Sequence, residues 1–283
     1  MIKPIQQDDA LLADIEKARQ DNAGLHLWWL GQSGFLLQWQ GHHVLIDPYL
    51  SDSLTKKYAQ TDKPHVRMSE RVIAPEKLDF IDVVTSSHNH TDHLDGETLI
   101  PLLQVNPDLK MIIPEANREF VANRIQQERD FPIGLNAGES VLVNGITFHG
   151  IPAAHNELDR DEKGQCLYMG YVIEFGPYTI YHSGDTLWHE EILKALVPFA
   201  IDVAILPING NVPSRRVAGN LNAEEAVRMA KTVGAKVVIP CHYHMFEFNT
   251  VEPDQFAEIA EGENQESYVM QLGERWSWEK KKG

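Results

Sequence analysis

Cysteine and long apolar runs are what this chain most clearly lacks. Its 283 residues include only two cysteines, Cys166 and Cys241, which lie far apart in the sequence. Two thiols cannot build a disulfide framework, so we expect reduced side chains. No apolar run reaches the roughly 18 residues of a membrane-spanning helix, and residues 1–22 lack the apolar segment of a signal peptide. We therefore expect a cytoplasmic protein without a membrane span.

Positive charge is also scarce, because 25 lysines and arginines face 41 aspartates and glutamates and leave a formal net charge of −16. Proteins that bind nucleic acid usually carry a basic surface that meets the phosphates, so we expect no nucleic-acid partner. The hydrophobic and charged fractions, 43% and 23%, are ordinary for a globular protein. No linker or low-complexity stretch divides the chain, and we expect a single domain over residues 1–283.

The apolar pattern predicts a mixture of helices and short strands. An N-terminal helix is expected at 8–22 because its apolar residues fall on one face, and it should pack on the domain as part of residues 1–23. Further helices are expected at 116–128, 189–196, 222–233 and 253–261. Strands are expected at 25–30, 35–39, 43–46, 80–85, 110–113, 145–151, 168–175, 178–182, 203–207, 236–240, 268–272 and 275–278.

The two halves of the chain echo each other faintly. In the first half, apolar runs lead to Asp47 and to His88, and in the second half they lead to Asp185 and to His242. Each run would be a buried strand that delivers a polar residue at its C-terminal end. The echo suggests two β-sheets packed face to face with helices outside, and a site at the edge where the strands end.

The strongest pattern is a cluster of metal-ligand side chains directly after the strand expected at 80–85. Its members are His88, His90, Asp92 and His93. Imidazole and carboxylate groups are natural ligands of zinc, manganese and iron. Alternate residues of an extended chain share a face, so His88 and His90 can reach one metal. If the chain then turns into a helix, Asp92 and His93 can reach a second. The alternative is a solvated polar loop.

Three more residues of ligand type follow apolar runs further along the chain. They are His155, Asp185 and His242. Each has an ordinary explanation when taken alone, since a lone histidine is often a surface or core residue and aspartate is common in turns. Together they add two imidazoles and a carboxylate that is able to bridge two metals.

Taken in order, these motifs resemble the metallo-β-lactamase superfamily. Asp47 comes first, the His-x-His-x-Asp-His run at 88–93 follows, and His155, Asp185 and His242 complete the series. The resemblance spans 47–242, which is most of the chain. It implies an α/β (α+β) fold, a four-layer αβ/βα sandwich of two mixed β-sheets.

The resemblance also implies a role for each motif residue. The first metal would be held by His88, His90 and His155. The second would be held by Asp92, His93 and His242. Asp185 would bridge the two ions, and Asp47 would orient ligands through hydrogen bonds. Two divalent ions (zinc, manganese or iron) would give a metal-bound hydroxide that attacks the substrate, with Asp92 and Asp185 as the catalytic carboxylates and Asp92 handling the proton.

Shorter motifs narrow the resemblance to one branch. Trp-Trp-Leu-Gly at 28–31, Tyr-His-Ser-Gly-Asp at 181–185 and the run at 236–240 are similar to the L-ascorbate-6-phosphate lactonases, although those enzymes lack a histidine at the position of His155. This implies a lactonase-like or esterase-like hydrolase acting on a small anionic, phosphorylated metabolite. Ser-His-Asn-His at 87–90 also resembles the N-acylphosphatidylethanolamine phospholipase D enzymes, so a phosphodiesterase is one alternative. A non-catalytic metal-binding protein on a hydrolase fold is another.

Substrate selection is expected in the loop at 207–216. It is rich in turn residues and carries Asn209 and the adjacent pair Arg215 and Arg216. Guanidinium groups suit phosphate or carboxylate, so this loop is the candidate contact for the anionic substrate. The alternative is that both arginines pair with surface acids. Relatives of this kind often assemble, so a homo-oligomer is a further expectation.

Overall fold

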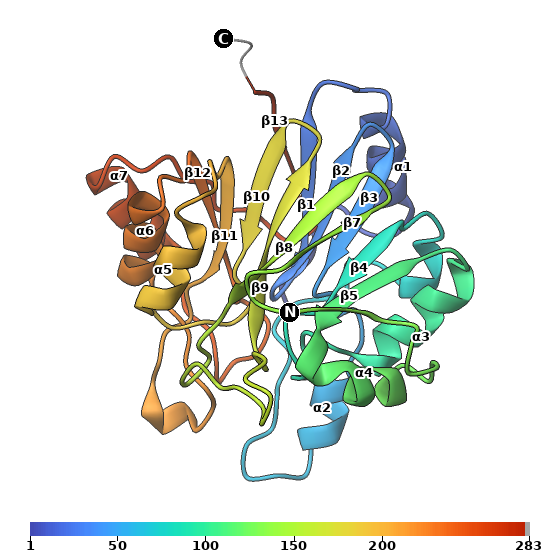
Figure 1. The fold of residues 1–283 in the computed structure, drawn as a ribbon, viewed down its shortest axis with the longest axis horizontal. Coiled ribbons are helices and arrows are strands. Elements are labelled where there is room, and N and C mark those ends of the chain that lie inside the picture. Colours follow the sequence, from blue (N-terminus) through green and yellow to red (C-terminus); the bar gives the residue numbers. More distant parts are fainter. Residues whose placement is uncertain (281–283) are drawn as a thin grey trace.

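The computed structural model describes residues 1–280, which form two β-sheets packed face to face between helices (Figure 1). The first sheet, as described, contains β1 Leu25–Gly31, β2 Gly34–Trp39, β3 His42–Ile46, β4 Val83–Thr85, β5 Lys110–Pro114, β6 Ile133–Leu135 and β13 Arg275–Trp278. The strand order is β13-β1-β2-β3-β4-β5-β6. Neighbours from β13 to β3 are antiparallel, and neighbours from β3 to β6 are parallel.

The second sheet is also mixed. Its strands are β7 Ser140–Val143, β8 Ile146–Pro152, β9 Met169–Phe175, β10 Tyr178–His182, β11 Val203–Pro207 and β12 Val237–Cys241. Their order is β12-β11-β10-β9-β8-β7. β10, β11 and β12 run parallel, whereas β7 to β10 pair antiparallel. Strands such as β11 and β12 are buried along their whole length, as expected for parallel strands covered on both faces.

Helices cover the outer face of each sheet. On the first sheet they are α1 Asp9–Ala18, α3 Gly96–Val105 and α4 Arg118–Arg124, and on the second they are α5 Glu190–Leu196, α6 Ala223–Thr232 and α7 Asp254–Gly262. The short helix α2 Ser53–Tyr58 lies beyond one end of the sheets, where its Leu54 packs into a separate small apolar cluster (Figure 1). Short 3-10 turns lie at Pro75–Lys77, Glu115–Asn117 and Pro213–Arg215. The result is the predicted four-layer arrangement, helices–sheet–sheet–helices (Figure 1).

Packing joins the layers through one apolar cluster. It includes Trp28 of β1, Phe148 of β8 and Ile15 of α1, all fully or almost fully buried. The N-terminal helix is held to the first sheet by Trp28, whose indole Nε1 donates to Asp14 Oδ2 at 3.0 Å. Both sheets and α1 therefore share one core, while the extent of the domain over residues 1–283 stays a prediction. No helix within residues 1–280 is long and apolar enough to cross a bilayer.

Most predicted elements are present, with one error and several omissions. The stretch 268–272, expected as a strand, is not one, and the chain there has only an isolated bridge just before it, between Val238 and Ser267. The helix expected at 116–128 is shorter, because it begins as a 3-10 turn and ends at Arg124. Four elements, α2, α3, β6 and β7, were not predicted from the sequence.

Candidate metal centre

Parallel strands bring the ligand-type residues to one edge of the two sheets. β3 and β4 run parallel and are followed by Asp47 and His88, respectively. In the other sheet β10 and β12 both run parallel to β11 and are followed by Asp185 and His242. Because the carboxyl ends of parallel strands lie at the same edge, residues distant in sequence meet there. This is the juxtaposition that the sequence echo predicted.

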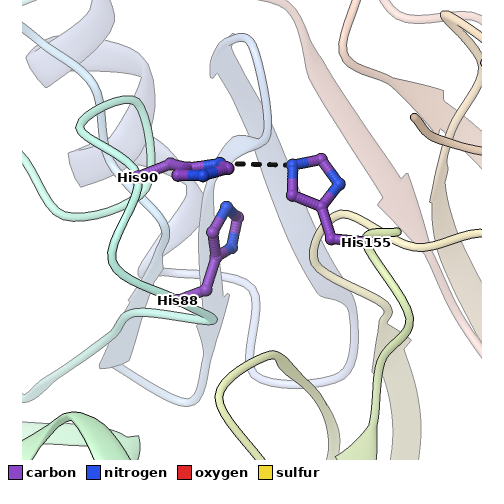
Figure 2. A group of neighbouring side chains, drawn as sticks. All are labelled: His88, His90 and His155. Carbon is purple, nitrogen blue, oxygen red and sulfur yellow. Dashed lines mark hydrogen bonds between the residues drawn. The ribbon is translucent and has the colours of Figure 1, made fainter. Parts of the chain in front are cut away.

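Three histidines form the first group of ligand-type atoms. His88 and His90 extend from the loop after β4, and His155 extends from the loop after β8, so that the three rings face one another (Figure 2). One ligand atom of each lies within 4.8 Å of those of the other two. His155 Nε2 lies 3.2 Å from His90 Nδ1, and its Nδ1 lies 2.9 Å from the Gly219 carbonyl, which orients the ring.

A second group lies beside the first and shares Asp185 with it. Asp92, His93 and His242 also bring ligand atoms within 4.8 Å of one another. Asp185 Oδ1 lies 3.3 Å from His93 Nε2, while Oδ2 lies 3.2 Å from His242 Nε2 and 3.5 Å from His155 Nε2. The Asp185 carboxylate therefore contacts histidines of both groups, which is the position that a bridging ligand needs.

The donor atoms of the two groups fit divalent metal ions. His88 Nε2, His93 Nε2 and Asp185 Oδ1 are buried and have no hydrogen-bond partner among residues 1–280. Buried polar atoms almost always have a partner, so a cluster of unpaired ones calls for an explanation. Imidazole nitrogens with a carboxylate are the donor set of zinc and of other first-row metals. A bound cation would satisfy these atoms together.

Asp47 and Ser87 hold the histidines in place. Asp47 Oδ2 lies 2.7 Å from His93 Nδ1, and Oδ1 accepts from the Ser87 backbone N–H at 2.9 Å. The Ser87 hydroxyl bonds to Asp47 Oδ2 and lies 2.9 Å from His88 Nδ1. Hydrogen bonds at Nδ1 leave the Nε2 atoms of His88 and His93 free to face the centre. The geometry matches the orienting role expected of Asp47, while Ser87 was missed.

Burial controls the protonation of two histidines in the first group. Burial, together with neighbouring histidine charges, lowers the pKa of His88 well below its usual value. Burial also lowers the pKa of His155 to about 4. Both rings are therefore unprotonated at neutral pH, which is the form that binds a metal.

The carboxylates of Asp185 and Asp92 raise the pKa of His93, whereas burial lowers the pKa of His88 and His155. Burial opposes the protonation of His93, but Asp185 and Asp92 outweigh that effect and raise the pKa of His93 well above its usual value. Burial would raise the pKa of Asp185, yet the charges of His242 and His93 hold it well below its usual value. Without a metal, the ionised Asp185 carboxylate therefore favours a proton on the neighbouring His93. A bound metal cation can take the place of the proton on His93.

Gln32 is a contact that the sequence analysis did not identify. It lies in the turn between β1 and β2 and is buried. Its Nε2 donates to Asp92 Oδ2 at 2.8 Å and lies 3.1 Å from His242 Nε2, while its carbonyl accepts from the His242 backbone N–H. The flanking glycines indicated only a turn, so no feature of the sequence pointed to this role.

A cavity of about 610 Å³ opens over the ligand groups. His90, Asp92 and Asp185 are among the residues that line it, together with two cations, Lys57 and Arg124. Neither cation makes an ion pair within residues 1–280, and the polar contacts of Arg124 are to the carbonyls of Asn89 and Leu94. Lys57 and Arg124, which were not selected from the sequence, are the lysine and the arginine among the residues that line the cavity.

The arginines that were selected lie elsewhere. Arg215 donates to the carbonyls of Asn209 and Thr250 and so braces its own loop. Arg216 forms an exposed ion pair with Asp62 at 2.8 Å. Neither arginine, nor Asn209, is among the residues that line the cavity. Their contact with substrate stays a prediction, and the structure gives all three residues other partners.

The chain matches a family model described as β-lactamase superfamily domain over residues 26–242. It is similar to a UPF0173 metal-dependent hydrolase of Methanosarcina mazei, with 27% identity over 257 residues that cover 89% of this chain and 98% of the relative. The match therefore extends over most of both proteins.

Solved structures share the fold. The metallo-β-lactamase fold protein YhfI from Bacillus subtilis is 20% identical, with a TM-score of 0.64 over 90% of this chain and 100% of that one. The isothiocyanate hydrolase from Delia radicum gut bacteria is 22% identical, with a TM-score of 0.70 over 90% of this chain and 99% of that one. The predicted metallo-β-lactamase fold is therefore confirmed.

Proposed function

The chain belongs to the β-lactamase superfamily domain family, and on that premise we propose that it is a hydrolase that uses two divalent metal ions. The observation that carries the proposal is the convergence of two ligand groups on one shared carboxylate. Asp185 Oδ2 lies near His155 of the first group and His242 of the second, and its Oδ1 lies near His93 of the second. Three of the buried donor atoms, His88 Nε2, His93 Nε2 and Asp185 Oδ1, have no hydrogen-bond partner among residues 1–280.

In this proposal His88, His90 and His155 would hold the first ion, Asp92, His93 and His242 would hold the second, and Asp185 would be a ligand shared by both. When bound, such a pair supplies Lewis-acid polarisation of the substrate and a nucleophile at neutral pH. Asp47 and Ser87 fix the ring orientations through Nδ1. We assign proton handling to Asp92, whose carboxylate borders the cavity and is held by a hydrogen bond from Gln32 to Oδ2.

The charges that line the cavity support a small anionic substrate. Lys57 and Arg124 border it without carboxylate partners in the described chain, in a protein whose formal net charge is −16. A guanidinium or ammonium group that lacks an acidic neighbour is available to a substrate phosphate or carboxylate. We therefore favour lactone or ester hydrolysis of an anionic metabolite and assign its charged group to Lys57 and Arg124.

The test combines metal analysis with a substrate panel. Protein purified without chelator should contain about two divalent ions per chain, by the two-ion proposal. It should hydrolyse anionic lactones in a chelator-sensitive manner. Failure to take up zinc, manganese or iron would contradict the proposal. A clear preference for phosphodiesters over lactones would favour the phosphodiesterase alternative, and full metal occupancy without any turnover would favour a binding protein.

Asp185→Asn should reduce metal content and turnover together, because the amide removes the negative charge that both groups share. Elemental analysis and initial rates measure the two effects. Asp108→Asn, on an exposed turn away from the site, is the matched control and should change neither quantity. Normal metal content and normal turnover in Asp185→Asn would show that the bridging assignment is wrong.

A further inference from the structure

One side of the cavity is built from aromatic rings. We define the aromatic wall as Tyr58, His65, Phe246 and Phe248, all of which line the cavity. The Tyr58 and His65 rings stack at 4.1 Å between centroids. The His65 ring also meets Phe248 at 4.5 Å and Phe246 at 5.3 Å, both nearly edge to face. These four rings thus form one continuous surface beside the ligand groups.

Two residues that do not line the cavity pack against the aromatic wall. Lys63 places its Nζ 4.6 Å from the centre of the Phe248 ring, and the Tyr49 ring lies 5.9 Å from that of Phe246. Phe246 and Tyr49 belong to a small apolar cluster that is separate from the main core. Phe246 is itself buried, whereas Tyr58 and Phe248 pack against this cluster and are only partly buried, so part of each of these two rings is open to the cavity that they line.

Other lining residues of the cavity are also apolar and unusually exposed. Phe120 of α4 is 44% exposed and Val217 is 36% exposed. Single exposed apolar residues are common, but here they line the same cavity as the aromatic wall. Burial lowers the pKa of His65, so its ring is neutral at neutral pH and adds apolar surface rather than charge.

We propose that the substrate carries an aryl group that packs against the aromatic wall while its hydrolysable bond lies over the ligand groups. Aromatic rings favour offset or edge-to-face contact with another ring at the separations found within the wall. Ligand pockets of this size are typically lined by apolar and aromatic side chains around a few polar groups. The proposal rests on the proposed function, because it names the substrate class of the same site.

Binding of non-reactive acids tests the wall separately from catalysis. The zinc-loaded full-length protein would be titrated calorimetrically with 3-phenylpropionate, 3-cyclohexylpropionate and propionate. We expect the phenyl acid to bind about tenfold more tightly than propionate and more tightly than the cyclohexyl acid. Equal affinities for the phenyl acid and propionate would overturn the proposal. A cyclohexyl acid that binds as tightly as the phenyl acid would overturn the assignment of an aryl group.

Variants locate the effect on the wall. Phe248→Ala should remove most of the preference for the phenyl acid, and Tyr58→Leu should reduce it, while both keep their metal content. Leu142→Ala, at an exposed position of β7 outside the cavity, is the control and should leave the preference unchanged. A preference that survives both wall substitutions would overturn the proposal.

The two proposals fail in different ways. If the chain binds the phenyl acid selectively but shows no chelator-sensitive turnover of any substrate, the hydrolase proposal fails and the aryl preference stands. If turnover is chelator-sensitive but phenyl and unsubstituted acids bind equally, the hydrolase proposal stands and the aryl preference fails.

Discussion

Asp47 and His242 both hold a backbone conformation that residues other than glycine seldom adopt. Their φ angles are 40° and 64°. Such conformations cost energy and persist where surrounding contacts enforce them, often at functional sites. Asp47 is fixed by Ser87 and His93, and His242 by the carbonyl of Gln32. Each side chain therefore enters the centre in a single direction.

Asp47→Asn should weaken metal binding about 10- to 100-fold, since partners that orient ligands commonly contribute that much. The amide cannot accept from both Ser87 and His93 as the carboxylate does. Competition with a chromogenic chelator measures the affinity. Asp108→Asn serves again as the control. An unchanged affinity in Asp47→Asn would show that the histidines are oriented without this carboxylate.

His43 is a buried histidine far from the metal centre. It lies on β3 beside Phe80, with 4.8 Å between ring centroids, and its Nε2 has no partner among residues 1–280. Burial is the main cause that lowers its pKa to about 3. Between about pH 6.5 and pH 3 the unfolded chain binds a proton at this residue that the folded chain does not bind. Protonation of His43 therefore favours unfolding as the pH falls through this range.

His43→Leu should remove that acid sensitivity. In the wild type this residue should lower the free energy of unfolding by about 1.4 kcal/mol per pH unit below its unfolded pKa. Denaturant unfolding at pH 7 and at pH 5 measures the effect as a change in the stability difference between the two proteins. A stability difference that stays constant between the two pH values would contradict the prediction.

Candidate ligands could be chosen from the sequence because metal binding restricts residue types and spacing, and the structure brings their side chains together. His88, His90 and His155 carry a chemistry that few other side chains supply. Gln32 and Arg124 could not be predicted in this way, because their roles come from where the turn after β1 and the helix α4 lie in space. Adjacency of Arg215 and Arg216 in the sequence likewise did not reveal their protein partners, which are loop carbonyls for Arg215 and Asp62 for Arg216.

At the scale of elements, the turn that directly follows β10 sets the position of Asp185. Gly184 has a φ of 60°, and a Cβ added there would lie 2.6 Å from the Ser87 Cβ and 2.9 Å from the Met169 carbonyl. The close approach brings the loop after β10 against the loop after β4. Glycine is therefore required both by its conformation and by the lack of space.

Gly184→Ala should displace Ser87 and lower both thermal stability and metal content. Gly138→Ala is the matched control, because Gly138 also has a positive φ, of 84°, but nothing lies within 4 Å of an added Cβ. The control should lose only the roughly 1–2 kcal/mol of a left-handed non-glycine residue and keep its metal. Differential scanning fluorimetry and elemental analysis measure the two effects. Equal losses in both variants would show that the contact with Ser87 is unimportant.

Elements buried along their whole length were predicted most accurately. β10 and β11 have the expected bounds because continuous apolar runs mark them. The short strands β6 and β7 were missed, since each lies at a sheet edge and is partly exposed, which weakens the apolar pattern. The stretch 268–272 has the composition of a strand, yet no neighbouring strand pairs with it beyond one bridge.

At the scale of the whole molecule, each sheet supplies ligands to both groups. His88 and His93 follow β4 of the first sheet, whereas His155, Asp185 and His242 follow β8, β10 and β12 of the second. Bound ions would therefore connect the two sheets at this edge, in addition to the apolar core between them. Metal binding to the folded chain alone must also increase its stability.

Removal of metal should lower the thermal midpoint of unfolding and increase hydrogen exchange at the ligand loops of both sheets together. Ligand at 100 times its dissociation constant stabilises a folded chain by about 2.7 kcal/mol. Calorimetry and hydrogen exchange of the metal-loaded and chelated protein measure the change. Restoring zinc should reverse it. Identical midpoints in the two states, or faster exchange confined to one sheet, would contradict the prediction.

The distribution of the ligands along the chain has a consequence for biosynthesis. His88, His90 and His155 all precede β9 to β12 in the sequence. The ribosome therefore makes these three histidines before it makes most of the second sheet. The group of Asp92, His93 and His242 stays incomplete until His242 has left the exit tunnel. If the chain binds the two ions proposed, the second ion can be loaded only after β12 has been made, and a nascent chain that stalls before β12 would present the three histidines of the first group alone.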